Sequence, residues 1–87
     1  MGKFQKKIEE AENNIFVHTR LLNELKEESE NQTLVYNIVL ENARDDNTLY
    51  ILKNNLEQLL CQITIAEQMV EKYKLQKEYY LFIDKTN

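Results

Sequence analysis

The residues that could perform chemistry in this chain are few and lie far apart. His18 is the only histidine and Cys61 the only cysteine among 87 residues. A catalytic thiol needs a neighbouring base in an electropositive setting, and a helical metal site needs a second ligand three or four residues on. Leu21 and Leu22 occupy those two places after His18. We therefore expect no enzyme, no cofactor and no metal. We interpret His18 as a register-setting residue between helices and Cys61 as a small residue at an oligomer contact.

Two clusters of charged residues could also take part in chemistry or binding. The adjacent Asp45 and Asp46 could act in acid–base or metal chemistry, but no third ligand stands nearby in the sequence. Asp and Asn at the start of a helix accept hydrogen bonds from its free amides, so we expect Asp46 or Asn47 to cap a helix instead. Three lysines within residues 3–7 are typical of a solvated first turn. With a net charge of −4, the chain is not expected to bind nucleic acid.

The composition favours a folded, wholly helical protein. Hydrophobic residues make up 43% of the chain and charged residues 30%, with no proline and a single glycine, Gly2. Such a chain has no interior residue that breaks helices, and we expect one helical domain over residues 1–87. The lone cysteine excludes an internal disulfide, and no segment reaches the roughly 20 apolar residues of a membrane-spanning helix. Since no signal peptide is visible either, we expect a cytoplasmic protein without membrane contact.

Apolar residues recur at alternating spacings of three and four along two runs, which predicts one apolar stripe on each of two helices. In a repeating seven labelled a to g, the stripe occupies positions a and d. The first run starts with Phe4 at d and Ile8 at a, and the second with Leu49 at a and Leu52 at d. Because such stripes are buried against other helices, we predict a self-association seam. Its members are Ile8, Ile15, Leu22, Leu25, Leu52, Leu56, Leu59, Ile63 and Val70.

The spacing of apolar residues at positions a and d is interrupted at residues 28–32, which are all polar. The first helix is clean from Lys3 to about residue 30. Beyond it, the helix could continue with polar residues in its stripe, bend, or end, with Asn31 or Thr33 capping a new helix.

The next segments, residues 33–40 and 48–52, are rich in β-branched and aromatic side chains, which favour strands. A β-hairpin there, joining two helical arms, would resemble prefoldin-like chaperone subunits in outline. The chain lacks the glycine and proline of tight hairpin turns, so we favour helix. A short third helix at residues 33–43 is one form of this prediction.

The two long arms are nearly equal in length on either side of a polar turn at residues 43–48, and the last helix should run over residues 48–83. Folded back on each other, the arms bring Tyr80 near Phe4 and Ile63 near residues 22–25. We therefore predict an all-α fold, an antiparallel helical hairpin with coiled-coil-like seams. A lone hairpin of this size buries little surface, so we expect a homodimer that forms a helical bundle.

The tail Tyr79-Tyr80-Leu81-Phe82-Ile83 covers more than one face of a helix. Two of its members can pack on the first arm, and the others need a different contact. Tyrosine is enriched at protein interfaces because its ring is apolar and its hydroxyl can stay wet. The candidates for docking a partner are Tyr73, Tyr79, Tyr80 and Phe82.

These features favour a small, non-enzymatic protein–protein interaction module. It would act as an adaptor, regulator or inhibitor by binding a larger partner protein, as small phage- or mobile-element-encoded regulators do. The alternative is a structural or chaperone-like coiled-coil assembly subunit.

Overall fold

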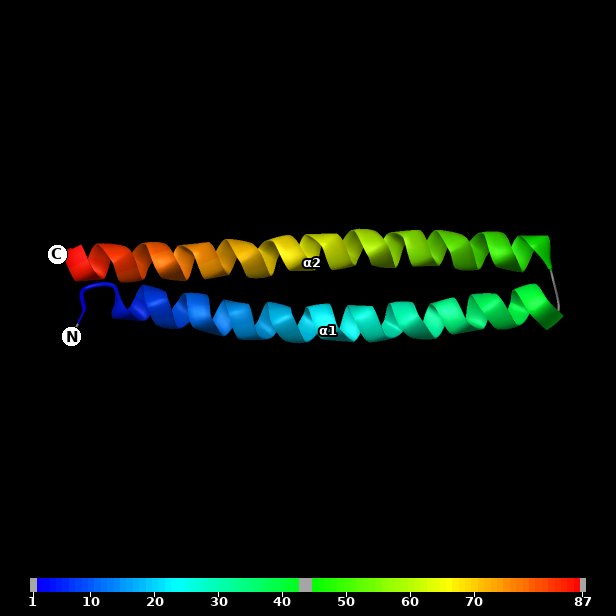
Figure 1. Ribbon diagram of the computed structural model, residues 1–87, viewed down its shortest axis with the longest axis horizontal. Helices are drawn as coiled ribbons and strands as arrows, with labels where there is room; N and C mark the ends of the chain where they lie inside the picture. Colours follow the sequence, from blue (N-terminus) through cyan, green and yellow to red (C-terminus); the bar gives the residue numbers. More distant parts are fainter. Residues whose placement is uncertain (1, 43–44, 87) are drawn as a thin grey trace.

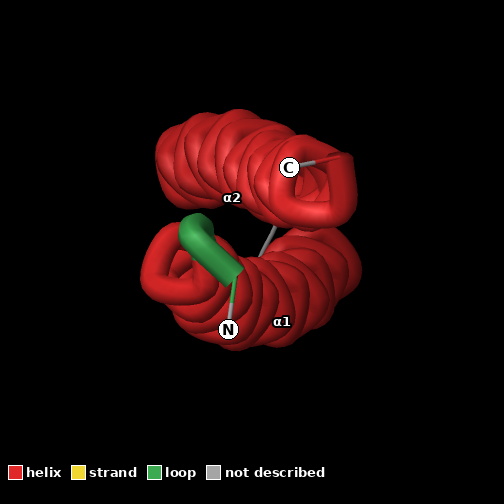
Figure 2. The backbone as a smooth tube through the Cα atoms, turned by 90° about the vertical axis from the view of Figure 1, so that its left-hand side faces the viewer, coloured by secondary structure: helices red, strands yellow, loops and turns green. Residues whose placement is uncertain are grey.

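The computed structural model describes residues 2–42 and 45–86, which form two long helices and no strand. Helix α1 spans Gln5–Asn42 and helix α2 spans Asp46–Thr86. The helices lie antiparallel and side by side, so both ends of the chain lie at the same end of a rod (Figure 1). The rod measures 64 × 14 × 13 Å along its principal axes. Viewed from its end, the two helices are inclined to each other (Figure 2). The predicted all-α antiparallel hairpin is confirmed.

Helix α1 runs straight through the polar stretch. Within it, the Thr33 hydroxyl donates to the Ser29 carbonyl oxygen at 2.8 Å and the Gln32 amide donates to the Glu28 carboxylate at 3.0 Å. The seam spacing never breaks, because Ser29 and Gln32 occupy its next a and d positions and Tyr36 follows at a. All three side chains are half-buried against α2.

Of the three courses left open at residues 28–32, the structure shows the first, a helix that continues with polar residues in its stripe. The preference for helix over strand beyond this point is confirmed, but the described residues form no separate third helix at 33–43. Residues 33–42 belong to α1 and residues 48–52 to α2, while positions 43 and 44 lie outside the described residues. Packing along an unbroken seam overrides the weak strand propensity of these segments.

Helix α2 starts at a different cap from the one that the sequence suggested. The carboxylate of Asp45 accepts hydrogen bonds from the backbone N–H of Asn47 at 3.1 Å and from the Thr48 hydroxyl at 3.0 Å. Its own carbonyl oxygen accepts the first helical bond, from the Leu49 amide at 2.9 Å. Asp45 is thus the N-cap, and Asp46 follows in the first turn, where its negative charge suits the positive end of the helix.

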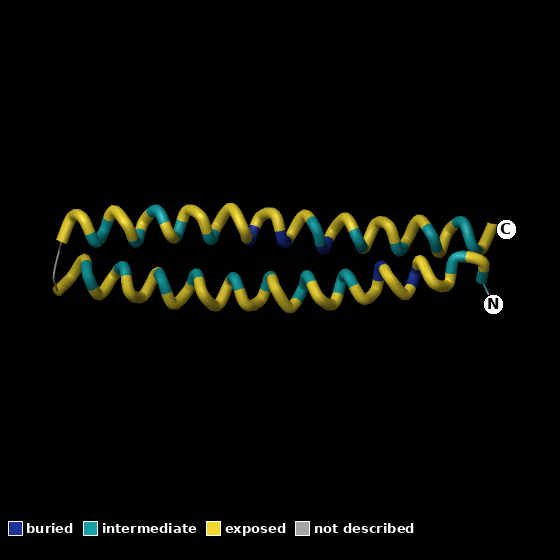
Figure 3. Tube along the Cα trace, turned by 180° about the vertical axis from the view of Figure 1, so that it is seen from behind, coloured by how far each residue is buried: buried dark blue, intermediate teal, exposed yellow. Residues whose placement is uncertain are grey.

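The buried positions lie where each helix faces the other, and the outer sides of both helices are made of exposed positions (Figure 3). No described side chain is completely enclosed, because two helices alone cannot surround a residue. The most deeply buried residues lie from the middle of the rod toward the chain ends. The buried hydrophobic residues are Ile8, Ala11, Ile63, Ala66 and Val70. Toward the turn, every described seam residue is only half-buried.

Contacts of α2 with α1, and with Phe4 directly before α1, fix how the helices are aligned. The rings of Phe4 and Tyr80 stack with their centroids 5.7 Å apart, which confirms the predicted neighbours. The His18 ring packs against the ring of Tyr73 at 5.1 Å. Further along, Leu25 of α1 lines a shallow hollow together with Ala66 of α2, so this turn of α2 lies beside the expected part of α1.

Candidate functional site

The nine residues of the predicted self-association seam lie in the internal seam of the hairpin. Ile8, Ile63 and Val70 are buried there, and the other six are half-buried. The hairpin uses this surface itself, packing α1 on α2. Any contact with a second protein must therefore use the outward faces of the helices.

The four docking candidates divide into two pairs. Tyr73 and Tyr80 are half-buried in the seam, where they pack on His18 and Phe4. Tyr79 and Phe82 point away from α1 and are 60% and 67% exposed. Only the second pair is available to a partner.

A third exposed apolar residue, Leu75, lies next to this pair and is 57% exposed. It was not among the docking candidates predicted from the sequence. Leu75, Tyr79 and Phe82 stand at i, i+4 and i+7, so they share one outward face of α2; we call them the docking stripe. The ring of Tyr79 meets the edge of the Tyr80 ring at 5.5 Å, and the stacking of Tyr80 on Phe4 anchors that pair to α1. Leu75 could have been identified from the sequence by its spacing of four and seven residues from Tyr79 and Phe82, not by being a leucine.

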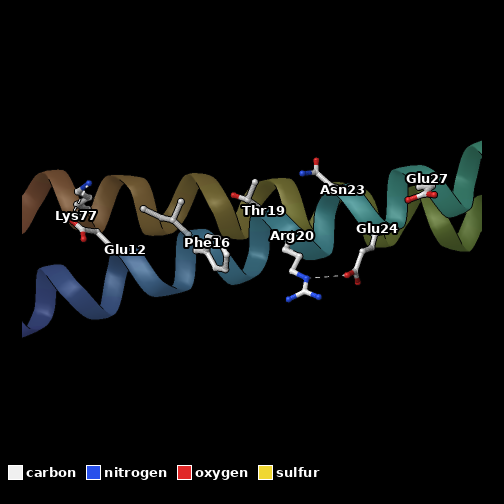
Figure 4. Close-up of a pocket in the computed structure, with 9 residues that line it drawn as sticks. Glu12, Phe16, Thr19, Arg20, Asn23, Glu24, Glu27 and Lys77 are labelled. Carbon is white, nitrogen blue, oxygen red and sulfur yellow. Dashed lines mark ion pairs between the residues drawn. The ribbon is translucent and has the colours of Figure 1, made fainter.

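A second feature is an open groove of about 630 Å³ along α1 (Figure 4). Ile15 and Phe16 supply its apolar surface. Its rim carries an ion pair between Arg20 and Glu24, with Nε and Oε1 3.4 Å apart. Lys77 reaches its other end from α2. The groove can accept an apolar side chain between charged groups, and its lining holds no serine, cysteine or histidine that could act as a nucleophile or base.

His18 and Cys61 lie apart, His18 in the seam and Cys61 on the exposed surface of α2. The His18 Nδ1 atom lies 2.8 Å from the carbonyl oxygen of Asn14, which can only accept, so Nδ1 carries the proton. This bond and the Tyr73 ring hold the imidazole in the seam. Cys61 is exposed on α2, in a hollow lined by Asn54, Glu57, Gln58 and Gln62. Within residues 2–42 and 45–86, no three His, Cys, Asp or Glu side chains are close enough to hold a metal ion.

Neither helix, over its described length, combines the length and apolarity that crossing a bilayer requires. No family model matches the chain, and no curated protein or solved structure matches it. The docking stripe and the groove along α1 are the outward features of the described residues that a partner could contact.

Proposed function

We propose that this protein is a small, non-enzymatic interaction module that inserts the docking stripe into an apolar groove of a larger partner protein. The observation that carries the proposal is the row of exposed apolar side chains, Leu75, Tyr79 and Phe82, on one face of α2. Amphipathic helices that enter a hydrophobic groove present their anchors at this i, i+4, i+7 spacing. Binding in this way would occupy the partner's groove, as an adaptor, regulator or inhibitor does.

The size of the stripe is adequate for such a contact. Each side chain is more than half exposed in the hairpin, so burial in a groove would contribute about 1–2 kcal/mol per residue, or about 4 kcal/mol together. A micromolar complex requires about 8 kcal/mol, so the stripe would supply roughly half and its surroundings the rest. Charged neighbours on α2, such as Lys72 and Glu78, flank the stripe and can form the polar rim of the interface.

The test is capture of partners from the native host by tagged chain carrying Tyr79→Ala plus Phe82→Ala. The matched control is Phe16→Ala plus Tyr50→Ala, which also removes one phenylalanine and one tyrosine, both 68% exposed and both outside the stripe. We expect a defined protein to be captured by the native chain and the control and lost from the stripe variant. Circular dichroism verifies that all three chains remain helical.

Equal capture by all three chains, or loss with the control alone, would contradict the docking stripe. Direct titration of the captured protein with purified chains then measures the affinity. We expect the stripe variant to bind at least about a hundredfold more weakly, the effect of removing most of two buried aromatic contacts.

The rod shape supports a second candidate, a structural coiled-coil assembly subunit. A hairpin 64 Å long with apolar residues on more than one outward face could join other copies along its length. This function predicts homo-assemblies larger than a dimer in light scattering, whereas the interaction module predicts a small defined species and a separate partner.

A further inference from the structure

We propose that a second copy of this chain packs against one long side of the hairpin, the side formed by positions c and g of both helices. We call it the c/g side. The c/g side includes Tyr79 of the docking stripe but neither Leu75 nor Phe82, which lie at position f, and the proposal rests on none of these three residues. It begins from an asymmetry in charge between the two long sides of the rod.

Positions c and g flank the seam on one side, and positions b and e flank it on the other. Each side has 23 positions within α1 and α2. The c/g side carries only five charged residues, which are Lys7, Glu10, Glu24, Glu28 and Lys72. The opposite side carries twelve, which are Glu9, Glu12, Lys26, Glu30, Asp46, Lys53, Glu57, Glu67, Glu71, Lys74, Glu78 and Lys85. Depletion of charge marks surfaces that become buried in interfaces.

The c/g side also carries apolar side chains in two blocks. The first block lies midway along the rod, where Leu21 of α1 and Ile65 and Met69 of α2 line one hollow. The second block lies toward the turn and consists of Val35, Ile38 and Ile51, all exposed. Residues seven apart on these helices share a face, so Val35 continues the row of Leu21, and Ile51 continues the row of Ile65.

A polar section separates the two blocks. Its amides at positions c and g, Asn55, Gln58 and Gln62, line a second hollow together with Glu28. Gln62 lines both this hollow and that of the first block, so the two are continuous on one side of the rod. Burial of amides against apolar groups would leave them without hydrogen bonds, whereas amide against amide satisfies them. The section therefore sets the register of a contact between two copies.

Two copies can meet face to face with their turns at the same end or at opposite ends. With the turns together, α1 of each copy lies on α2 of the other, and Glu28 meets the amide of Gln62 in the partner. With the turns apart, α1 lies on α1, and the carboxylates of Glu24 and Glu28 in one copy approach those of the other, which is unfavourable. The centre of the polar section lies on the turn side of the rod's midpoint, so the polar sections of two copies coincide along fully overlapping rods only when the turns are at the same end. We assign the arrangement with the turns together.

The area of this side is sufficient for a stable dimer. The flat outline of a face 64 Å long and 14 Å wide is about 900 Å² per copy, of the same order as the accessible surface of about 800 Å² that each partner buries in a typical stable interface. The hairpin has only five buried hydrophobic residues among those described, and pairing would enclose its half-buried seam residues from one further side. Four helices would then surround a common core.

The test uses two matched variants of α2. Ile65→Lys places a charge on the c/g side, and Leu60→Lys places one on the opposite side, at residues 59% and 56% exposed in the hairpin. We measure mass by light scattering and sedimentation from 1 to 500 µM. The native chain and Leu60→Lys are expected to be dimers with similar dissociation constants. Ile65→Lys should raise the dissociation constant at least about a hundredfold, because twofold symmetry introduces the change twice.

Circular dichroism at the highest concentration establishes that both variants are helical, so a loss of dimer is not a loss of fold. A native chain that stays monomeric throughout, or a dimer that survives Ile65→Lys, would overturn the proposal. The arrangement is tested separately, with a spin label on Lys85→Cys in a Cys61→Ser background. Turns together give a distance under about 35 Å across four helices, and turns apart give more than about 50 Å, which would overturn the assigned arrangement.

Discussion

Substitution of Gln32 by leucine should stabilise the protein. Gln32 occupies a d position of the seam, is half-buried, and lines one hollow with Leu59 of α2. Glutamine and leucine have nearly the same helix propensity, so the change acts on packing rather than on the helix itself. The only side-chain hydrogen bond lost is the exposed one to Glu28, at 3.0 Å.

The expected gain follows from the area that a leucine would bury. Full burial of a leucine contributes about 1.5–3 kcal/mol, so a half-buried one beside Leu59 should contribute about 1 kcal/mol. The exposed bond to Glu28 offsets little of this, because water replaces it readily. For a chain of this length, about 1 kcal/mol raises the melting temperature by about 4–8 °C.

The assay is thermal unfolding followed by circular dichroism at one fixed protein concentration, so that any self-association affects all chains alike. Gln68→Leu is the control, because it makes the same chemical change at an exposed position of α2. We expect the control to leave the melting temperature within about 2 °C of native, as surface substitutions do. An equal shift in both variants, or a destabilised Gln32→Leu, would refute the placement of Gln32 in a continuous seam.

Two further predictions concern the cap and the core. Asp45→Ala should lower the free energy of unfolding by about 1 kcal/mol in urea titrations, because it removes the N-cap of α2. The control, Asn47→Ala, should change the free energy of unfolding by under about 0.5 kcal/mol. Equal effects of the two substitutions would show that Asp45 is not the cap. Ile63→Ala should lower the free energy of unfolding by about 2–3 kcal/mol, because Ile63 is buried. Leu60→Ala, at an exposed position, should lower it by under about 1 kcal/mol. Comparable losses from the two substitutions would place the core elsewhere.

Much of the fold could be predicted from the sequence, because a helical hairpin is encoded locally. The three-and-four spacing identified both stripes, and the equal arms predicted that Tyr80 would meet Phe4. The end of the first helix could not be predicted in this way. Ser29 and Gln32 give no hydrophobic signal, and the strand propensity of residues 33–40 conflicts with their helical state.

The candidate site was predicted in part. The sequence pointed to the aromatic tail, but it could not separate Tyr79 and Phe82, which face outward, from Tyr73 and Tyr80, which pack on α1. That separation depends on which way α2 is rotated about its own axis when it meets α1. Spacing places side chains on faces, and only the packed partner decides which face is covered.

The sequence by itself determined that two amphipathic helices form and fold back on each other, since helical periodicity and the lack of internal helix breakers are local properties. Only the tertiary structure decided three features: the unbroken course of α1, the cap at Asp45, and the apolar residues left on the outer faces. The physical reason is that burial in a hairpin is set by contacts between residues distant in sequence, which no local pattern encodes.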